Sequence, residues 1–335
     1  MKIKHRRVTS SGLANLVGCA LLASSALANA LDTQREDVAA FVAQMTEKHG
    51  LDAGSVSQLL AQAEIKPGIL DAISKPAERT LEWFEYRPIF ITEKRISKGS
   101  EFWQTEQDTL AEISAEYGVA PEVLVAIVGV ETYYGQIMGS YRVLDALSTL
   151  AFEYPPRSGF FLGQLEEFLV LSGESGVDPV TATGSYAGAM GAPQFIPSSF
   201  RAYAVDQDKD GRIDLWQNWQ DILASVANYF NAHGWKNGEE IAVRASRNGE
   251  SIAGSRELVM DTTVGALRAA GWEFETSLPA ETPAMAIRLQ GTSSPEYWVG
   301  FNNFRVITRY NHSVMYAMAV NQLAQEVVHR TQLAK

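Results

Sequence analysis

Apolar residues recur at helical spacing through much of the chain. Between residues 35 and 65, Val38, Phe41, Val42 and Met45 would share one helix face. A second set of apolar residues at helical spacing follows within the same range. The same spacing predicts further helices, one starting at Pro121 and the others over residues 102–117, 145–152, 160–171, 221–233 and 313–328. Residues 81–88 are instead predicted to be an aromatic-rich break closed by proline.

The pattern changes between residues 236 and 300. Short apolar stretches separated by Gly, Asn, Ser and Pro predict strands at 241–244, 284–289 and 297–301, interrupted by a helix at 264–270. The sequence therefore predicts an α+β protein that is mainly α, with a small β-containing segment.

The first 30 residues have the pattern of an export signal. A basic start precedes an apolar stretch, and Ala28-Asn29-Ala30 fits the small-x-small rule for cleavage. Cys19, the only cysteine of the chain, lies inside this segment in a context similar to a lipoprotein signal. Because the apolar stretch continues past Cys19, we expect a soluble exported protein in the periplasm of a Gram-negative cell. An outer-membrane lipoprotein with a lipidated Cys19 is the alternative.

Cleavage after Ala30 would leave a chain without cysteine and with a net charge of −15, since the signal holds four of 28 basic residues and none of 39 acidic ones. Such a chain has no disulfide and no catalytic thiol. Its acidity argues against phosphate-mediated binding of nucleic acid and favours a neutral or cationic ligand, or a metal.

Glu131 is the candidate catalytic residue. It is the one carboxylate in Ala126-Ile-Val-Gly-Val-Glu131-Thr-Tyr-Tyr-Gly135. Apolar surroundings favour the protonated form of a carboxyl, which can then donate its proton to a leaving group. The alternative is a buried core glutamate, a rare residue without a partner.

An acidic loop is the candidate metal site. Asp206, Asp208 and Asp210, followed by glycine, match positions 1, 3, 5 and 6 of an EF-hand-like Ca²⁺ loop, and the carbonyl of Arg212 would be the ligand at position 7. Gln217 stands where the bidentate glutamate belongs, so we expect Asp221 to complete the sphere. A solvated acidic turn is the alternative.

Other chemistries have little support. The five histidines form no HExxH pair, and the chain has no GxSxG, Walker or dinucleotide motif. Carboxylate chemistry between aromatic walls remains, as in sites that cleave glycans.

Three ordered motifs resemble the lytic murein transglycosylase B family. They are Val128–Gly135, Gly184–Gly191 with Gln194-Phe195-Ile196-Pro197-Ser198-Ser199, and Arg309–Ser313 with Tyr316-Ala317-Met318-Ala319-Val320. The resemblance extends over roughly residues 35–330. It implies a lysozyme-like helical core with a flanking helical domain, a small β domain and a structural Ca²⁺ ion. We accordingly divide the chain into a signal peptide (1–30), an N-terminal helical domain (31–107), a core (108–235) with the metal loop at 206–221, a β-containing insertion (236–300) and a C-terminal segment (301–335).

The resemblance also implies residue roles. Glu131 would be the single catalytic acid/base, and the glycan groove would be lined by Tyr86, Arg157, Ser185, Gln194, Tyr229, Tyr310, Asn311 and Tyr316. The family often has two adjacent basic residues where Pro156-Arg157 stand, so only Arg157 is carried over. Peptidoglycan strands would be the partner, with other cell-wall enzymes as further candidates and a membrane only if Cys19 is lipidated.

A single carboxylate implies that the substrate supplies its own nucleophile. Hydrolytic glycosidases use two carboxylates. The family reaction instead cleaves the MurNAc-β-1,4-GlcNAc bond without water and leaves 1,6-anhydro-MurNAc ends, as in cell-wall turnover. Two alternatives stay open: a muramidase hydrolase in which Asp145 or Glu153 positions water, and an inactive peptidoglycan-binding protein held together by Ca²⁺.

Overall fold

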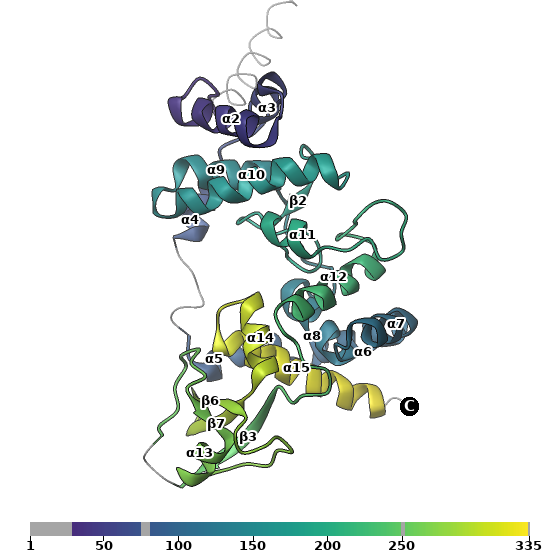
Figure 1. Ribbon diagram of the computed structural model, residues 1–335, viewed down its shortest axis with the longest axis vertical. Coiled ribbons are helices and arrows are strands. Elements are labelled where there is room, and N and C mark those ends of the chain that lie inside the picture. Colours follow the sequence, from purple (N-terminus) through teal and green to yellow (C-terminus); the bar gives the residue numbers. More distant parts are fainter. Residues whose placement is uncertain (1–28, 75–80, 249–251, 334–335) are drawn as a thin grey trace, which may run out of the picture.

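The computed structural model describes residues 29–74, 81–248 and 252–333. The predicted signal segment lies almost entirely outside these residues. Figure 1 shows an elongated molecule in which an upper group of helices is followed by a central helical body and then by a small sheet at the lower end.

The upper group joins two separate stretches of the chain. From the N-terminal stretch come α2 (Glu36–His49), α3 (Ala53–Leu60) and α4 (Pro67–Ile73). They pack against α9 (Val143–Glu153) and α10 (Ser158–Glu174), which are joined by the short helix η2 (Pro155–Arg157). Helix α10 also contacts α11 (Pro197–Tyr203). Apolar residues at helical spacing form these contacts, and Val38, Phe41 and Met45 are all buried.

The central body surrounds an apolar helix, α8 (Pro121–Thr132), that packs against the long C-terminal helix α15 (Val314–Leu333). Residues 123–130 of α8 are all buried. Around this pair lie α5 (Trp83–Phe90), α6 (Glu93–Thr105), α7 (Gln107–Tyr117), α12 (Trp219–Ala232) and α14 (Asn302–Tyr310). The helices of residues 31–107 thus fall into two groups, and their contacts do not follow the predicted boundary at residue 107.

The lower end is an antiparallel sheet with the strand order β4-β6-β7-β3-β5. Its strands are β3 (Ala242–Arg247), β4 (Thr262–Thr263), β5 (Trp272–Glu273), β6 (Pro283–Gln290) and β7 (Pro295–Gly300). One face joins the main core through residues such as Ile287, and the other packs on α13 (Val264–Ala269) through Val299. A second, two-stranded sheet pairs β1 (Tyr141–Arg142) with β2 (Thr183–Gly184) beside the candidate site.

Most predicted elements are present, but the prediction for residues 81–88 was wrong. This segment is helix α5, with Pro88 inside it. A capping box between Glu82 and Glu85 starts the helix, and Trp83 and Tyr86 are buried in the core. The helix predicted over 102–117 is two helices that meet at Glu106, and α4 and α14 were not predicted. Tertiary packing overrode the local signals in these segments.

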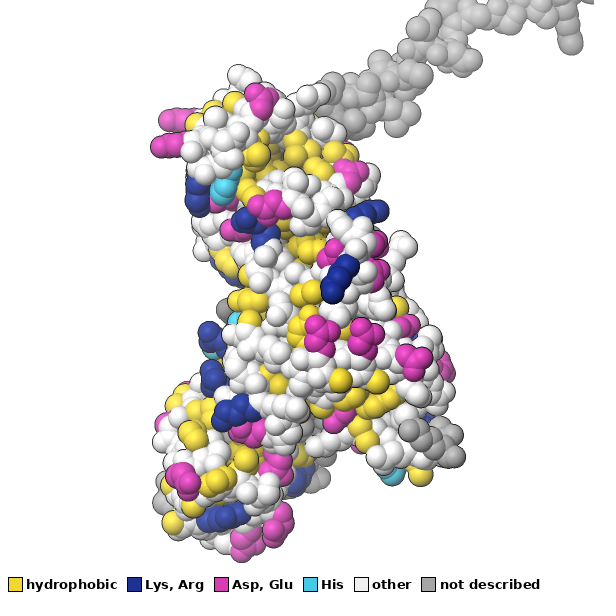
Figure 2. Space-filling view, turned by 45° about the vertical axis from the view of Figure 1, so that its right-hand side comes forward, with side chains coloured by type: hydrophobic (Ala, Val, Ile, Leu, Met, Phe, Trp, Pro, Cys, Tyr) yellow, Lys and Arg dark blue, Asp and Glu magenta, His cyan; other side chains and the backbone are white. Residues whose placement is uncertain are grey.

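No single helix of the described residues is long and apolar enough to cross a membrane. Only α7 and α8 together reach the required length and composition, and they are bent by 113° relative to each other. On the face in Figure 2, acidic and basic side chains are interspersed, without a broad basic patch.

Candidate active site

Glu131 lies at the C-terminal end of α8 and is partly exposed. The chain leaves the helix through three successive left-handed residues, Tyr133 (φ 52°), Tyr134 (φ 59°) and Gly135 (φ 77°). Left-handed backbone is unfavourable for tyrosine and clusters at functional sites. The turn is held by Tyr134, whose hydroxyl donates to the carbonyl of Arg95 at 2.9 Å.

Gly129 makes room for this turn. A Cβ atom at residue 129 would lie 2.8 Å from the ring and hydroxyl of Tyr134. The glycine one helical turn before the end of α8 therefore lets Tyr134 fold back on the helix, which leaves Glu131 at a rigid terminus.

Tyr316 fixes the orientation of the Glu131 carboxyl. Its hydroxyl donates to Glu131 Oε1 at 2.5 Å, across 185 residues of sequence. The Tyr316 side chain is 2% exposed, and burial together with the negative charge of Glu131 raises its pKa well above the usual value of a phenol. Tyr316 thus remains protonated, and a hydrogen-bond donor, at neutral pH.

Tyr310 closes the site from the end of α14. Its hydroxyl donates to the carbonyl of Pro193 at 2.6 Å, and burial and the charge of Glu131 raise its pKa well above the usual value. The ring packs against Phe195 and Tyr229, with centroids 5.9 and 4.9 Å away. Asn311 follows directly as the C-cap of α14 and is partly exposed.

The glycine-rich loop is held against α8 by polar contacts. Thr132 Oγ1 donates to the carbonyl of Ala192 at 2.9 Å. Ser185 Oγ accepts the N–H groups of Ala187 and Ala189, at 3.2 and 3.1 Å. This turn requires glycine at residue 184, because a Cβ there would be 2.2 Å from the carbonyl oxygen of Ala189.

Gln194 has a left-handed backbone (φ 53°) and ties the loop together. Its amide nitrogen donates to the carbonyls of Gly191 and Met138, at 2.9 and 3.1 Å. The structure therefore brings Ser185 and Gln194 to the loop facing α8, and both side chains position its backbone.

Three other residues predicted to line the glycan groove, Tyr229, Tyr86 and Arg157, lie in different surroundings. Tyr229 is 7% exposed and lies beneath Tyr310, and its hydroxyl donates to the carbonyl of Arg309 at 2.6 Å. Tyr86 is 1% exposed, and its ring packs between Trp83 and Phe90. Tyr86 is close enough to Tyr316 to influence its pKa. Tyr229 and Tyr86 support the site from below.

Arg157 lies apart from these residues, in η2 of the upper helical group. It is exposed, and its guanidinium group lies over the rings of Phe160 and Phe161, 4.4 and 5.3 Å from their centroids.

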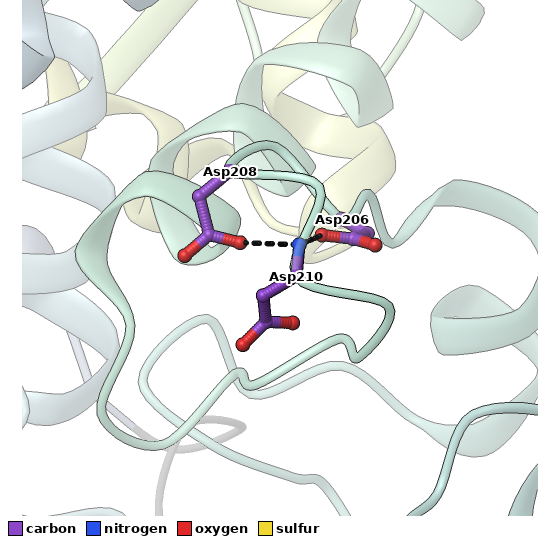
Figure 3. A group of neighbouring side chains, drawn as sticks. All are labelled: Asp206, Asp208 and Asp210. Atoms are coloured by element: carbon purple, nitrogen blue, oxygen red, sulfur yellow. Dashed lines mark hydrogen bonds between the residues drawn. The ribbon is translucent and has the colours of Figure 1, made fainter.

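The acidic loop brings Asp206, Asp208 and Asp210 together, with one carboxylate oxygen of each lying within 4.8 Å of the others (Figure 3). The loop folds around Asp206, whose two oxygens accept the N–H groups of Asp210 and Gly211 at 3.2 and 2.9 Å. Three oxygens at this spacing fit a hard cation such as Ca²⁺.

Asp221 does not join this group of three. Its side chain is fully buried, and its oxygens accept the N–H groups of Gln207 and Asp214, at 2.8 and 2.9 Å. Burial raises the pKa of Asp221, and the two hydrogen bonds oppose that change. The predicted metal ligand is therefore a clamp between the two ends of the loop. Asn218, which we did not predict, caps α12 and also donates to Asp208 at 2.9 Å.

Comparison of the chain with known proteins identifies its family. A model of the family described as Transglycosylase SLT domain matches residues 33–325. The chain belongs to this family. It is 42% identical over 296 residues to the membrane-bound lytic murein transglycosylase B of Escherichia coli (strain K12), a match that covers 86% of this chain and 81% of that protein.

Solved structures agree. The soluble lytic transglycosylase SltB1 of Pseudomonas aeruginosa matches with a TM-score of 0.84 and 51% identity, over 88% of this chain and 99% of that one. The Escherichia coli lytic transglycosylase Slt35 in complex with calcium matches with a TM-score of 0.79 and 41% identity, over 87% and 92%. These findings confirm the predicted mainly helical, lysozyme-like fold and the lytic transglycosylase class.

The two carboxylates considered for a hydrolytic mechanism are engaged elsewhere in this transglycosylase. Asp145 is 2% exposed and accepts two hydrogen bonds from Arg142, at 2.8 and 2.9 Å, and one from the N–H of Glu64. Glu153 forms an ion pair with Arg35. Both carboxylates hold the upper helical group together.

Proposed function

We propose that the chain is a peptidoglycan lytic transglycosylase in which Glu131 is the only catalytic acid and base. The observation that carries the proposal is the Glu131 carboxyl at a rigid helix end, oriented by Tyr316, while Asp145 and Glu153 are bound to arginines elsewhere. A site with one working carboxyl needs a nucleophile from the substrate.

In the first step the 2-acetamido oxygen of MurNAc attacks C1 of the same sugar. The bond from C1 to the GlcNAc oxygen breaks, and that oxygen takes the proton of Glu131. Tyr316 keeps its own proton throughout, because its pKa is far above neutrality, and it holds Oε1 in place. Positioned proton transfer of this kind contributes about 10²–10⁴-fold to the rate.

In the second step the ionised Glu131 accepts the proton of the C6 hydroxyl. O6 attacks C1, the bond from the acetamido oxygen to C1 breaks, and the 1,6-anhydro ring closes. Glu131 is protonated again, and no water is consumed. Tyr310, which packs on the buried rings of Phe195 and Tyr229, forms an aromatic wall that would keep water from C1.

Mass spectrometry of the products tests this mechanism. Purified sacculi digested with the enzyme should release muropeptides that end in 1,6-anhydro-MurNAc, lighter than the hydrolytic products by one water, about 18 Da. Reducing MurNAc ends would instead support the muramidase hydrolase, and an absence of soluble products would support an inactive binding protein.

We further propose that Asp206, Asp208 and Asp210 bind a Ca²⁺ ion with a structural role, helped by the carbonyl of Arg212. The Slt35 relative was solved in complex with calcium, and this chain brings three carboxylates together at the alternate spacing of an EF-hand-like loop. The loop connects α11 to α12, so the ion would hold two helices of the protein together.

Chelation of Ca²⁺ should lower the melting temperature. A ligand that binds only the native state stabilises it by about 2.7 kcal/mol at a hundredfold excess over Kd. Calorimetry with chelator should show this loss, and Ca²⁺ should reverse it better than Mg²⁺. Asp208→Ala should melt like the chelated protein and stay active at low temperature, whereas Asp108→Ala, at an exposed aspartate of α7, should still respond to Ca²⁺. A melt that ignores both chelator and Ca²⁺ would return the loop to a solvated acidic turn.

The relative in Escherichia coli is membrane-bound and acts on murein, as its name states, which fits an envelope location. We propose that this chain is released into the periplasm after cleavage at Ala30, with peptidoglycan strands as its partner. Intact-mass analysis should then find Leu31 as the first residue. A mass that includes a lipid-modified Cys19 would place the protein on a membrane.

A further inference from the structure

A hollow lies at the end of α8 opposite Glu131. It has a volume of about 560 Å³, and it is bounded by the first turn of α8, the start of β3 and the C-terminal half of α15. We call it the α8–β3 groove. Its walls include Val123, Ile241, Val243 and Val328. Glu131 lies eight residues after Val123 along α8, about 12 Å from it at 1.5 Å per residue.

Two buried polar atoms in the wall of the α8–β3 groove have no hydrogen-bond partner among the described residues. One is Nδ2 of Asn321, whose side chain is 3% exposed. The other is Oε1 of Glu239, whose second oxygen pairs with Lys236 Nζ at 3.0 Å. Buried donors and acceptors are rarely left unpaired, because each loses its hydrogen bonds to water. A donor and an acceptor in one apolar groove therefore indicate a ligand with the complementary groups.

The charge of the groove defines the ligand further. Glu122 and Glu240 line it together with Glu239, and His329 is the one basic side chain among the lining residues. Glu240 already accepts a hydrogen bond from Thr276, so Glu239 has the buried oxygen that is left for a cation. An anion would face three carboxylates.

We propose that the α8–β3 groove binds a small organic cation, a primary amine on an apolar stem that also carries a carbonyl oxygen. Small turns of the two side chains bring these atoms to the groove, where the ammonium group donates to Glu239 Oε1, the carbonyl accepts from Asn321 Nδ2, and the stem covers Val123 and Val328. The volume lies within the roughly 300–1,000 Å³ of small-molecule sites, which combine apolar walls with a few polar groups.

Titration calorimetry with three related probes tests the ligand class. L-Phenylalaninamide has all three features, N-acetyl-L-phenylalaninamide lacks the positive charge, and phenethylamine lacks the carbonyl. L-Phenylalaninamide should bind once per chain, about tenfold or more tighter than either comparison compound, as expected for a hydrogen bond to a charged group. Saturating muropeptide should not displace it, because Glu131 lies at the opposite end of α8.

Two near-isosteric variants assign the contacts. Glu239→Gln should abolish the preference for the charged amine, and Asn321→Leu should abolish the preference for the carbonyl. Asn321→Leu should also keep or raise the melting temperature, because it removes a buried unpaired donor. Glu326→Gln, on α15 but outside the groove, should change neither preference. Equal binding of the acetylated probe, no saturable binding, unchanged binding by Glu239→Gln or displacement by muropeptide would each overturn the proposal.

Discussion

Glu131→Gln is expected to reduce the release of anhydro-muropeptides by more than about 10²–10⁴-fold, because one carboxyl serves as acid in the first step and as base in the second. The amide keeps the size of the side chain and can still accept a hydrogen bond from Tyr316, so folding and glycan binding should be retained. A turnover assay on sacculi, with binding measured separately by co-sedimentation, checks this result.

The control for this variant is Glu112→Gln, an exposed carboxyl on α7. It should turn over at the rate of the unmodified protein. If Glu131→Gln kept more than about a tenth of the activity, the free energy lost would be below about 1.4 kcal/mol, and Glu131 would not be the acid.

Gly191→Ala is expected to destabilise the protein by about 2–4 kcal/mol, the sum of a left-handed backbone and a steric clash. Gly191 has φ 66°, and a Cβ there would lie 2.2 Å from the carbonyl oxygen of Leu215. That carbonyl accepts the N–H of Ala192 at 2.7 Å. The hydrogen bond joins the glycine-rich loop to the second half of the 206–221 loop. Denaturant unfolding measures the loss.

Gly163→Ala provides a control of opposite sign. Gly163 lies inside α10 with no atom within 4 Å of an added Cβ, so alanine should stabilise the helix by about 0.5–1 kcal/mol. If Gly191→Ala were as stable as the unmodified protein, the loop could move away from Leu215. Close packing of Gly191 would then not be what holds Gln194 beside α8.

Local patterns predicted the parts of the site that lie close together in sequence. The helix from Pro121, with a single carboxylate at its apolar end, and the aspartates at alternate loop positions both follow from spacing along one segment. Residue types at fixed short spacing determine such features, because the backbone geometry between them is that of one helix or one turn.

The sequence alone therefore determined which carboxyl stands at the end of α8, which loop gathers three aspartates, and, through its motifs, which family the chain belongs to. Only the tertiary structure decided that Tyr316 orients Glu131, that Tyr229 supports Tyr310 from below, and that Asp221 clamps the acidic loop. It also decided that Pro88 lies inside a helix. These outcomes depend on burial and on hydrogen bonds between distant segments, and their free energies outweigh the local preferences that a sequence pattern records.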